Sequence, residues 1–180
     1  MSRITHINPT ELSADLQPLF HRYAVEYGAF GNQASVLAHV PPAFVHLTSM
    51  LTELKHREVT PWRYIELAIV TVSRLNACTY CVSHHTPVLE TIGVSPQAAA
   101  QVLEYETVDE FDEIDRVVIE YAIAVTRDAR RVSDVLFARL RQHFSEEQVV
   151  ELTLRIGLCG FFNRFNDALR IEIEDGVLPL

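Results

Sequence analysis

The chain has 180 residues, of which 48% are hydrophobic and 22% charged, a composition typical of a globular protein rather than a disordered one. This length predicts one compact domain spanning residues 1–180. The net charge of -9 would repel a phosphate backbone, which excludes nucleic acid as a partner. No run is long and apolar enough to span a bilayer, and residues 1–20 lack the features of a secretory signal. We therefore expect a cytoplasmic protein with no membrane partner.

Most of the chain carries the spacing of apolar residues that predicts α-helices. Residues 11–27 show it first, with Pro18 as a kink or boundary. The segment 60–75 begins with Thr60 as a candidate cap, although its β-branched run at 69–72 would also suit a strand. Because no Asn-Gly or Asp-Gly turn joins two alternating runs, the predicted fold class is all-α, a compact multi-helix domain. The expected helices lie at 11–27, 41–56, 60–75, from about Cys78 onward, and at 95–105, 109–131, 132–144 and 145–171.

One spacing of polar residues occurs twice, 85 residues apart. A glutamate is followed after twelve residues by a first cysteine or asparagine, and after three more by a second. The fold could therefore contain an internally duplicated helical unit, of which only the first copy kept thiols. The two sets are Glu66, Cys78 and Cys81, and Glu151, Asn163 and Asn166.

The segment ACTYCVSHHTP, residues 77–87, concentrates two cysteines and two histidines. Haem attachment would need a histidine directly after the second cysteine, where the chain has Val82. A structural zinc site would need four ligands, and the third cysteine, Cys159, is isolated in an apolar segment. A thioredoxin-like pair would sit in a βαβ unit, which the predicted helices do not supply. The remaining interpretations are a redox pair or two buried cysteines that only fill space.

A helix that starts near Cys78 would favour thiol chemistry. The unpaired N–H groups and the dipole at a helix start lower the pKa of a nearby thiol. Cys78 and Cys81 would share a face, so a disulfide could close after a modest adjustment. His85 follows Cys81 by one turn on that face and could take its proton, whereas His84 would point about 100° away.

The spacing E-x11-C-x2-C-x3-H resembles the active-site signature of the alkylhydroperoxidase D (AhpD) family, within the carboxymuconolactone decarboxylase superfamily. SRLNACTYCVSHHT is similar to that family's active-site segment, and GFFNRFNDAL to a C-terminal segment of its peroxidase-related members. The resemblance implies an AhpD-like all-α domain, with an N-terminal helical extension at about 1–40 and an active-site core at about 60–95. The residues that carry the signature are Glu66, Cys78, Cys81 and His85.

The resemblance implies a role for each of these four residues. Cys81 would attack the peroxide O–O bond and become a sulfenic acid, and Cys78 would resolve it as a disulfide. His85 would take the proton of the attacking thiol, with Glu66 orienting the imidazole. The best-known peroxidase of the family has a histidine at the position of Tyr80, so this departure puts efficient peroxide reduction in question. Further candidates for a secondary role are Tyr80, His84 and Asn166.

The residues and the resemblance together predict an enzyme, a peroxidase-related protein that reduces (alkyl) hydroperoxides without haem, flavin or metal. Its partners would be a hydroperoxide, a dithiol or protein-thiol reductant, and further copies of the chain. Family members form trimers or hexamers, and the helices at 60–75 and 145–171 are too apolar to stand exposed. Two alternatives stay open: a disulfide reductase or adaptor, and a non-catalytic oligomeric thiol sensor. Decarboxylation is disfavoured, because the true decarboxylases of the superfamily do not depend on this cysteine pair.

Overall fold

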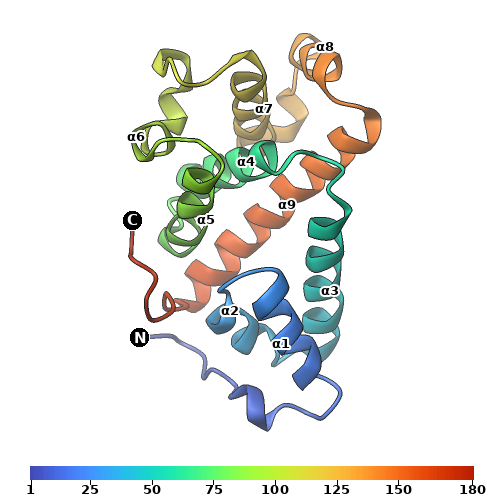
Figure 1. The fold of residues 1–180 in the computed structure, drawn as a ribbon, viewed down its shortest axis with the longest axis vertical. Helices are drawn as coiled ribbons and strands as arrows, with labels where there is room; N and C mark the ends of the chain where they lie inside the picture. Colours follow the sequence, from blue (N-terminus) through green and yellow to red (C-terminus); the bar gives the residue numbers. More distant parts are fainter. The chain divides into compact units, whose positions relative to one another are not determined.

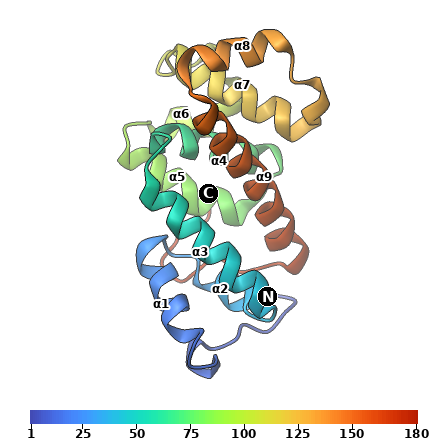
Figure 2. The same cartoon turned by 90° about the vertical axis from the view of Figure 1, so that its right-hand side faces the viewer.

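The computed structural model describes residues 1–180 and confirms the all-α fold, with helices and no strand. Figures 1 and 2 show the order of the helices along the chain. The α-helices are α1 (Gln17–Glu26), α2 (Gly31–Leu37), α3 (Pro41–Arg57), α4 (Trp62–Leu75), α5 (Thr79–Thr91), α6 (Pro96–Ala100), α7 (Glu113–Asp128), α8 (Asp134–His143) and α9 (Glu146–Leu169). The 3-10 helices are η1 (Pro9–Glu11), η2 (Val102–Thr107) and η3 (Ala129–Arg131).

The chain divides into two compact units. The first, here named the N-terminal unit, comprises residues 1–58 and 166–179. The second, here named the thiol unit, comprises residues 59–165 together with Leu180. The four signature residues all lie in the thiol unit.

In the N-terminal unit, α1 and α2 each pack against α3. Helix α3 begins at Pro41, and proline suits a first turn because the N–H that it lacks would have no partner within the helix. The rings of Phe20 on α1 and Phe44 on α3 stack with their centroids 6.1 Å apart. The chain after α9 returns to this unit, where the carboxylate of Glu174 accepts a 2.8 Å hydrogen bond from the backbone N–H of Asn32.

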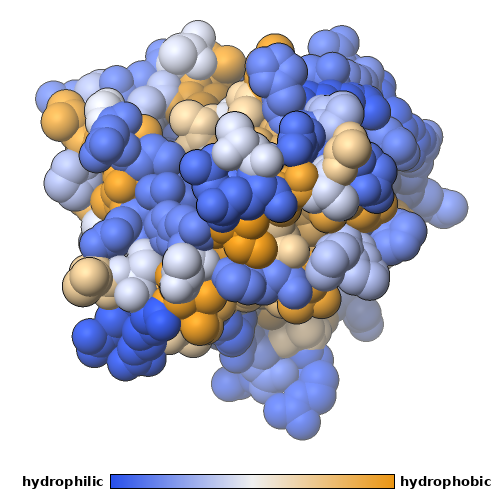
Figure 3. All heavy atoms as spheres, turned by 90° about the horizontal axis from the view of Figure 1, so that it is seen from below, coloured by the Kyte–Doolittle hydropathy of each residue, from blue (hydrophilic) through white to orange (hydrophobic).

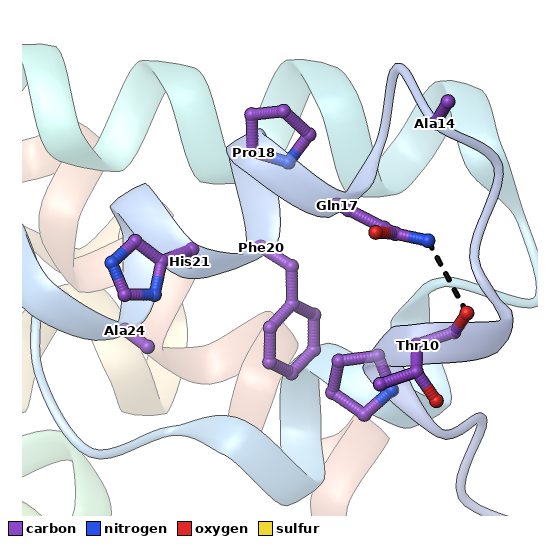
Figure 4. Close-up of a pocket in the computed structure, with 8 residues that line it drawn as sticks. Thr10, Ala14, Gln17, Pro18, Phe20, His21 and Ala24 are labelled. Atoms are coloured by element: carbon purple, nitrogen blue, oxygen red, sulfur yellow. Dashed lines mark hydrogen bonds between the residues drawn. The ribbon is translucent and has the colours of Figure 1, made fainter.

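An open pocket of about 590 Å³ lies beside η1 and α1 in this unit (Figure 4). The side chain of Gln17 donates a 3.2 Å hydrogen bond to the carbonyl of Thr10 at its edge. His21 is the one titratable side chain among the residues that line it. The residues that line the pocket therefore do not combine a nucleophile with a base. On the face drawn in Figure 3, hydrophobic residues form small patches between hydrophilic ones.

In the thiol unit, α4 packs against both α5 and α7, and α8 packs against α7. Every residue of α4 from 65 to 73 is buried, which explains why its sequence is apolar nearly all round. At the start of α4, the guanidinium of Arg63 donates two hydrogen bonds, of 2.9 and 2.6 Å, to the fully buried carboxylate of Asp115. Asp115 also completes the capping box at the start of α7. This bidentate pair holds α4 in a fixed position against α7.

The structure corrects the predicted start of α4. Thr60 does not cap this helix: its hydroxyl donates a 2.7 Å hydrogen bond to the carboxylate of Glu151, and Pro61 takes the capping position without a side-chain bond. The β-branched run at 69–72 is helical, because burial on all sides outweighs its local preference for a strand.

Other boundaries also differ from the prediction. The helix expected at 11–27 begins only at Gln17, so that Pro18 lies in its first turn and marks a boundary, the second of the two predicted alternatives, rather than a kink. The segment 95–105 divides between α6 and η2. Helix α2 was not predicted, because its seven residues are too few to show a clear period. No helix in the structure combines the length and the apolarity needed to cross a membrane.

Candidate functional site

The break between α4 and α5 shapes the candidate site. Helix α4 ends in a Schellman motif, in which the N–H of Ala77 donates to the carbonyl of Arg74 (3.1 Å) and the N–H of Cys78 to that of Ser73 (3.0 Å). Ala77 has a left-handed backbone with φ of 55°. Glycine is the usual residue there, and an L-residue with a Cβ costs roughly 1–2 kcal/mol in this conformation. One helix thus ends and the next begins within three residues, at the expense of backbone strain.

Both thiols of the pair lie at the start of α5. Cys78 is the N-cap residue and Cys81 the third residue of the helix, so both lie near N–H groups that have no partner within it. Those groups and the helix dipole stabilise a negative charge placed beside them. Cys78 is fully buried and Cys81 is 4% exposed. Both are thiols rather than parts of a disulfide, as is Cys159.

The fold brings His85 and Glu66 into contact. Nδ1 of His85, on α5, lies 2.8 Å from Oε2 of Glu66, on α4. A carboxylate oxygen can only accept, so Nδ1 carries the hydrogen and Nε2 is the basic nitrogen of the neutral ring. The side chains of Glu66 and His85 are 1% and 12% exposed, and a charge-assisted bond in such a dry place holds the ring in one orientation. By helical spacing, His85 lies one turn after Cys81 on the same face.

Tyr80 and His84 form a second pair on α5. Their rings stack with centroids 4.3 Å apart and an angle of 28° between planes. Nδ1 of His84 lies 2.7 Å from the carbonyl oxygen of Tyr80, so this nitrogen also carries a hydrogen. Both side chains are buried. From the helical spacing, the pair projects from another side of α5 than Cys81 and His85.

A polar cluster at the break was missed by the sequence analysis. Sγ of Cys159, on α9, lies 3.3 Å from Oγ of Ser73 and 3.5 Å from the carbonyl oxygen of Ile69. One turn later on α9, Asn163 donates from Nδ2 to Oγ of Ser73 (3.3 Å). Its Oδ1 accepts a 2.8 Å hydrogen bond from Nδ2 of Asn76. The third cysteine therefore belongs to the surroundings of the signature residues.

Burial makes Cys159 an unreactive thiol. It raises the pKa of this thiol to about 12, while the hydrogen bond with Ser73 opposes the rise to a smaller extent. Negative charge on Cys78 and on Glu66 raises the pKa of Cys159 further. At neutral pH the sulfur of Cys159 is therefore protonated, and only a thiolate is a strong nucleophile.

Asn166 and Glu151 lie in different units of the chain and have different hydrogen-bond partners. Asn166 belongs to the N-terminal unit, where its side-chain amide donates a 3.2 Å hydrogen bond to Oε1 of Gln33. Glu151, in the thiol unit, accepts from Thr60 and lies 3.6 Å from the guanidinium of Arg155. Helix α9 runs unbroken through this segment, whereas the segment from Glu66 breaks after α4. The two segments share a spacing but not a backbone path.

The arrangement in the thiol unit is suited to thiol chemistry. It combines two thiols at a helix start with an imidazole whose tautomer is fixed by a buried carboxylate. No group of three or more His, Cys, Asp or Glu side chains in the chain is arranged to hold a metal ion.

Residues 41–124 match the carboxymuconolactone decarboxylase family. The uncharacterized protein YnjA of Escherichia coli (strain K12) is 30% identical over 136 residues, which are 74% of this chain and 74% of YnjA. An uncharacterized peroxidase-related protein from Ralstonia eutropha JMP134, described as an alkylhydroperoxidase AhpD core, is similar with a TM-score of 0.82 at 24% identity, over 99% of this chain and 98% of that one. The debrominase Bmp8 in complex with 2,3,4-tribromopyrrole is similar with a TM-score of 0.80 at 21% identity, over 97% of this chain and 95% of Bmp8. The chain therefore belongs to the carboxymuconolactone decarboxylase family and has the AhpD-like fold.

Proposed function

We propose that this protein is a thiol peroxidase that reduces hydroperoxides through Cys78 and Cys81. The observation that carries the proposal is the 2.8 Å hydrogen bond between Glu66 and His85, one turn from Cys81. Attack on a peroxide needs a base that ionises the sulfur and an acid that returns the proton to the leaving oxygen. A histidine with one nitrogen held by a carboxylate can do both with the other nitrogen. The AhpD-like fold supports the same class of chemistry.

In the first step, Nε2 of His85 takes the proton of the Cys81 thiol, and Glu66 stabilises the imidazolium. The Cys81 thiolate attacks the terminal oxygen of the hydroperoxide and the O–O bond breaks. Cys81 becomes a sulfenic acid, and the alkoxide leaves as an alcohol with the proton from His85. The sulfur loses the two electrons that the peroxide gains.

In the second step, the thiol of Cys78 attacks the sulfenic sulfur of Cys81. A disulfide forms, and the hydroxyl of the sulfenic acid leaves as water with the proton of Cys78. A dithiol donor then exchanges with this disulfide and returns both thiols. The cycle uses no bound cofactor: its electrons come from the dithiol.

The proposal is tested by steady-state consumption of hydrogen peroxide and tert-butyl hydroperoxide, with dithiothreitol as the donor. We expect continuous turnover by the native chain, none by Cys81→Ser, and turnover by Cys159→Ala, because Cys159 takes no part in the cycle. Reduction of a small disulfide without consumption of peroxide would instead indicate a disulfide reductase. A single oxidation without turnover would indicate a sensor, and either result contradicts the proposal.

The likeness of the fold to Bmp8, whose structure holds a brominated pyrrole, suggests a second candidate function. Reductive removal of bromine would use the same two thiols: the thiolate takes the bromine, the ring carbon takes a proton, and closing the disulfide releases bromide. Bromide release from 2,3,4-tribromopyrrole by the reduced protein tests this function. Faster oxidation of the thiols by tribromopyrrole than by either peroxide would favour it over the peroxidase.

A further inference from the structure

The side-chain amide of Asn163 binds the turn between α4 and α5 at two points. Its Oδ1 accepts from Nδ2 of Asn76 (2.8 Å), the last residue before the strained Ala77. Its Nδ2 donates to Oγ of Ser73 (3.3 Å), whose carbonyl accepts the N–H of Cys78. Asn163 is 1% exposed, so water does not replace these bonds while the fold is intact. We name this two-point contact the amide clamp.

The amide clamp acts on a turn that carries backbone strain. Ala77 has φ of 55°, a conformation in which its Cβ crowds the backbone. Cys78 follows directly and has extended rather than helical torsions (φ -81°, ψ 95°). The direction of its side chain is therefore set by the turn. Cys81, in contrast, lies inside α5, and its backbone is fixed by the helix itself.

We propose that Asn163 is a positioning residue for the resolving step, in which Cys78 attacks oxidised Cys81. This inference rests on the proposed function. The new S–S bond forms only when the two Cβ atoms and both sulfurs reach a narrow geometry. The amide clamp holds Cys78 in the backbone conformation from which that geometry is reached. The first step depends on Cys81, His85 and the peroxide, whereas the two hydrogen bonds of the clamp join Asn163 to Asn76 and Ser73.

The two steps can be measured apart after rapid mixing with one equivalent of hydrogen peroxide. Loss of peroxide reports the attack by Cys81. Quenching with dimedone and then an alkylating reagent, followed by mass spectrometry, reports the sulfenic acid and the disulfide. In Asn163→Ala we expect peroxide loss within about twofold of the native rate, disulfide formation slowed by about tenfold, and a transient sulfenic acid on Cys81.

Matched variants separate positioning from general loss of structure. Tyr121→Phe removes another side-chain hydrogen bond to α9, the 2.7 Å bond with Thr153, and should change neither rate. Adding Ala77→Gly to Asn163→Ala should recover part of the resolving rate, because glycine adopts the left-handed conformation without steric cost. If Asn163→Ala does not fold, Asn76→Ala provides a second test, because it removes only the hydrogen bond between Asn76 and Asn163. This variant should also slow disulfide formation while leaving the loss of peroxide close to the native rate.

Equal slowing of both steps, or a native resolving rate in Asn163→Ala and Asn76→Ala, would overturn the inference. These outcomes leave the thiol cycle itself intact. If the native protein forms neither sulfenic acid nor disulfide, the proposed function fails first, and the inference fails with it.

Discussion

Two segments of the chain have the same spacing of polar residues but differ in their backbone path and in the partners of their side chains. From Glu66 the chain reaches Cys78 through a helix that stops, turns at a strained alanine and starts again. From Glu151 it reaches Asn163 within one unbroken helix. The first path leaves its cysteines at a helix start and turns His85 back onto Glu66. The second leaves Glu151 bonded to Thr60 and near Arg155. The break in the helix, rather than the spacing of residues, creates the candidate site.

The three cysteines sharpen the comparison, because all are buried thiols and only two lie at the break. We expect one equivalent of peroxide to join Cys78 and Cys81 in a disulfide, while Cys159 stays a thiol. With a pKa of about 12, only about one Cys159 in 10⁵ is ionised at pH 7. Differential alkylation and peptide mapping measure this all-or-none difference. Substantial oxidation of Cys159 alongside the pair would show that burial does not separate the two regions.

Removing the base should have the next largest effect. In His85→Ala, attack on peroxide should slow by about one to two powers of ten at pH 7, because no base remains to take the proton of the attacking thiol and only a thiolate is a strong nucleophile. The rate should then rise with pH as hydroxide replaces the lost base. Glu66→Gln keeps the imidazole but loses the charge of its partner, so its effect should be smaller. Glu151→Gln is the matched control in α9 and should leave the pH profile of attack unchanged.

The outer face of α9 gives a third test. Val150 and Leu154 are 67% and 40% exposed, Phe161 lies further along the same stripe, and Phe137 of α8 adds to it. Val150, Leu154 and Phe137 line an open apolar pocket of about 600 Å³. We expect the chain to self-associate through this face into a trimer or hexamer, with a mass that is a multiple of 20.4 kDa.

Multi-angle light scattering with Leu154→Lys tests this expectation, because a charge on the face should weaken assembly at least about tenfold. Val25→Lys places the same charge on a valine of the N-terminal unit that is 69% exposed, and it should leave the mass unchanged. A monomeric native protein at micromolar concentration would contradict the expectation.

The smallest effect is expected at the strained alanine. Ala77→Gly removes the steric cost of the left-handed conformation, but it also gives the unfolded chain more freedom, so the net gain in unfolding free energy should be about 0.5–1 kcal/mol. For a chain of this size that raises the Tm by roughly 1–4 °C. Ala68→Gly, inside α4, should instead lose about 1 kcal/mol or more. A lower Tm for Ala77→Gly would mean that the turn is not strained.

Sequence reasoning predicted the helices better than the site. Burial explains the long apolar runs at 60–75 and 145–171, and the helix expected from residue 95 begins directly after Ser95, which caps it. The start of α4 could not be predicted, because the hydroxyl of Thr60 donates to Glu151, 91 residues later in the chain, instead of capping the helix. Short helices such as α2 depend on tertiary contacts rather than on a period of their own.

At the site, spacing alone placed Cys78, Cys81 and His85 on one helix, and only the family resemblance pointed to Glu66. The contact between Glu66 and His85 depends on the angle between two helices, which no local pattern encodes. The cluster of Ser73, Cys159 and Asn163 left a weak signal: Cys159 and Asn163 are one turn apart on α9. Their partner on α4 became visible only in the fold. The single-domain organisation stays a prediction.

The central claim is that the break gives the two cysteines different tasks, and single-turnover peroxide reduction by Cys81→Ser and Cys78→Ser tests it most directly. Cys81→Ser should consume no peroxide, because no attacking sulfur remains. Cys78→Ser should consume one equivalent at close to the native rate and hold a sulfenic acid on Cys81 that dimedone traps. If Cys78→Ser eliminates the first turnover while Cys81→Ser keeps it, the attacking and resolving roles are reversed and the Glu66–His85 relay does not serve Cys81.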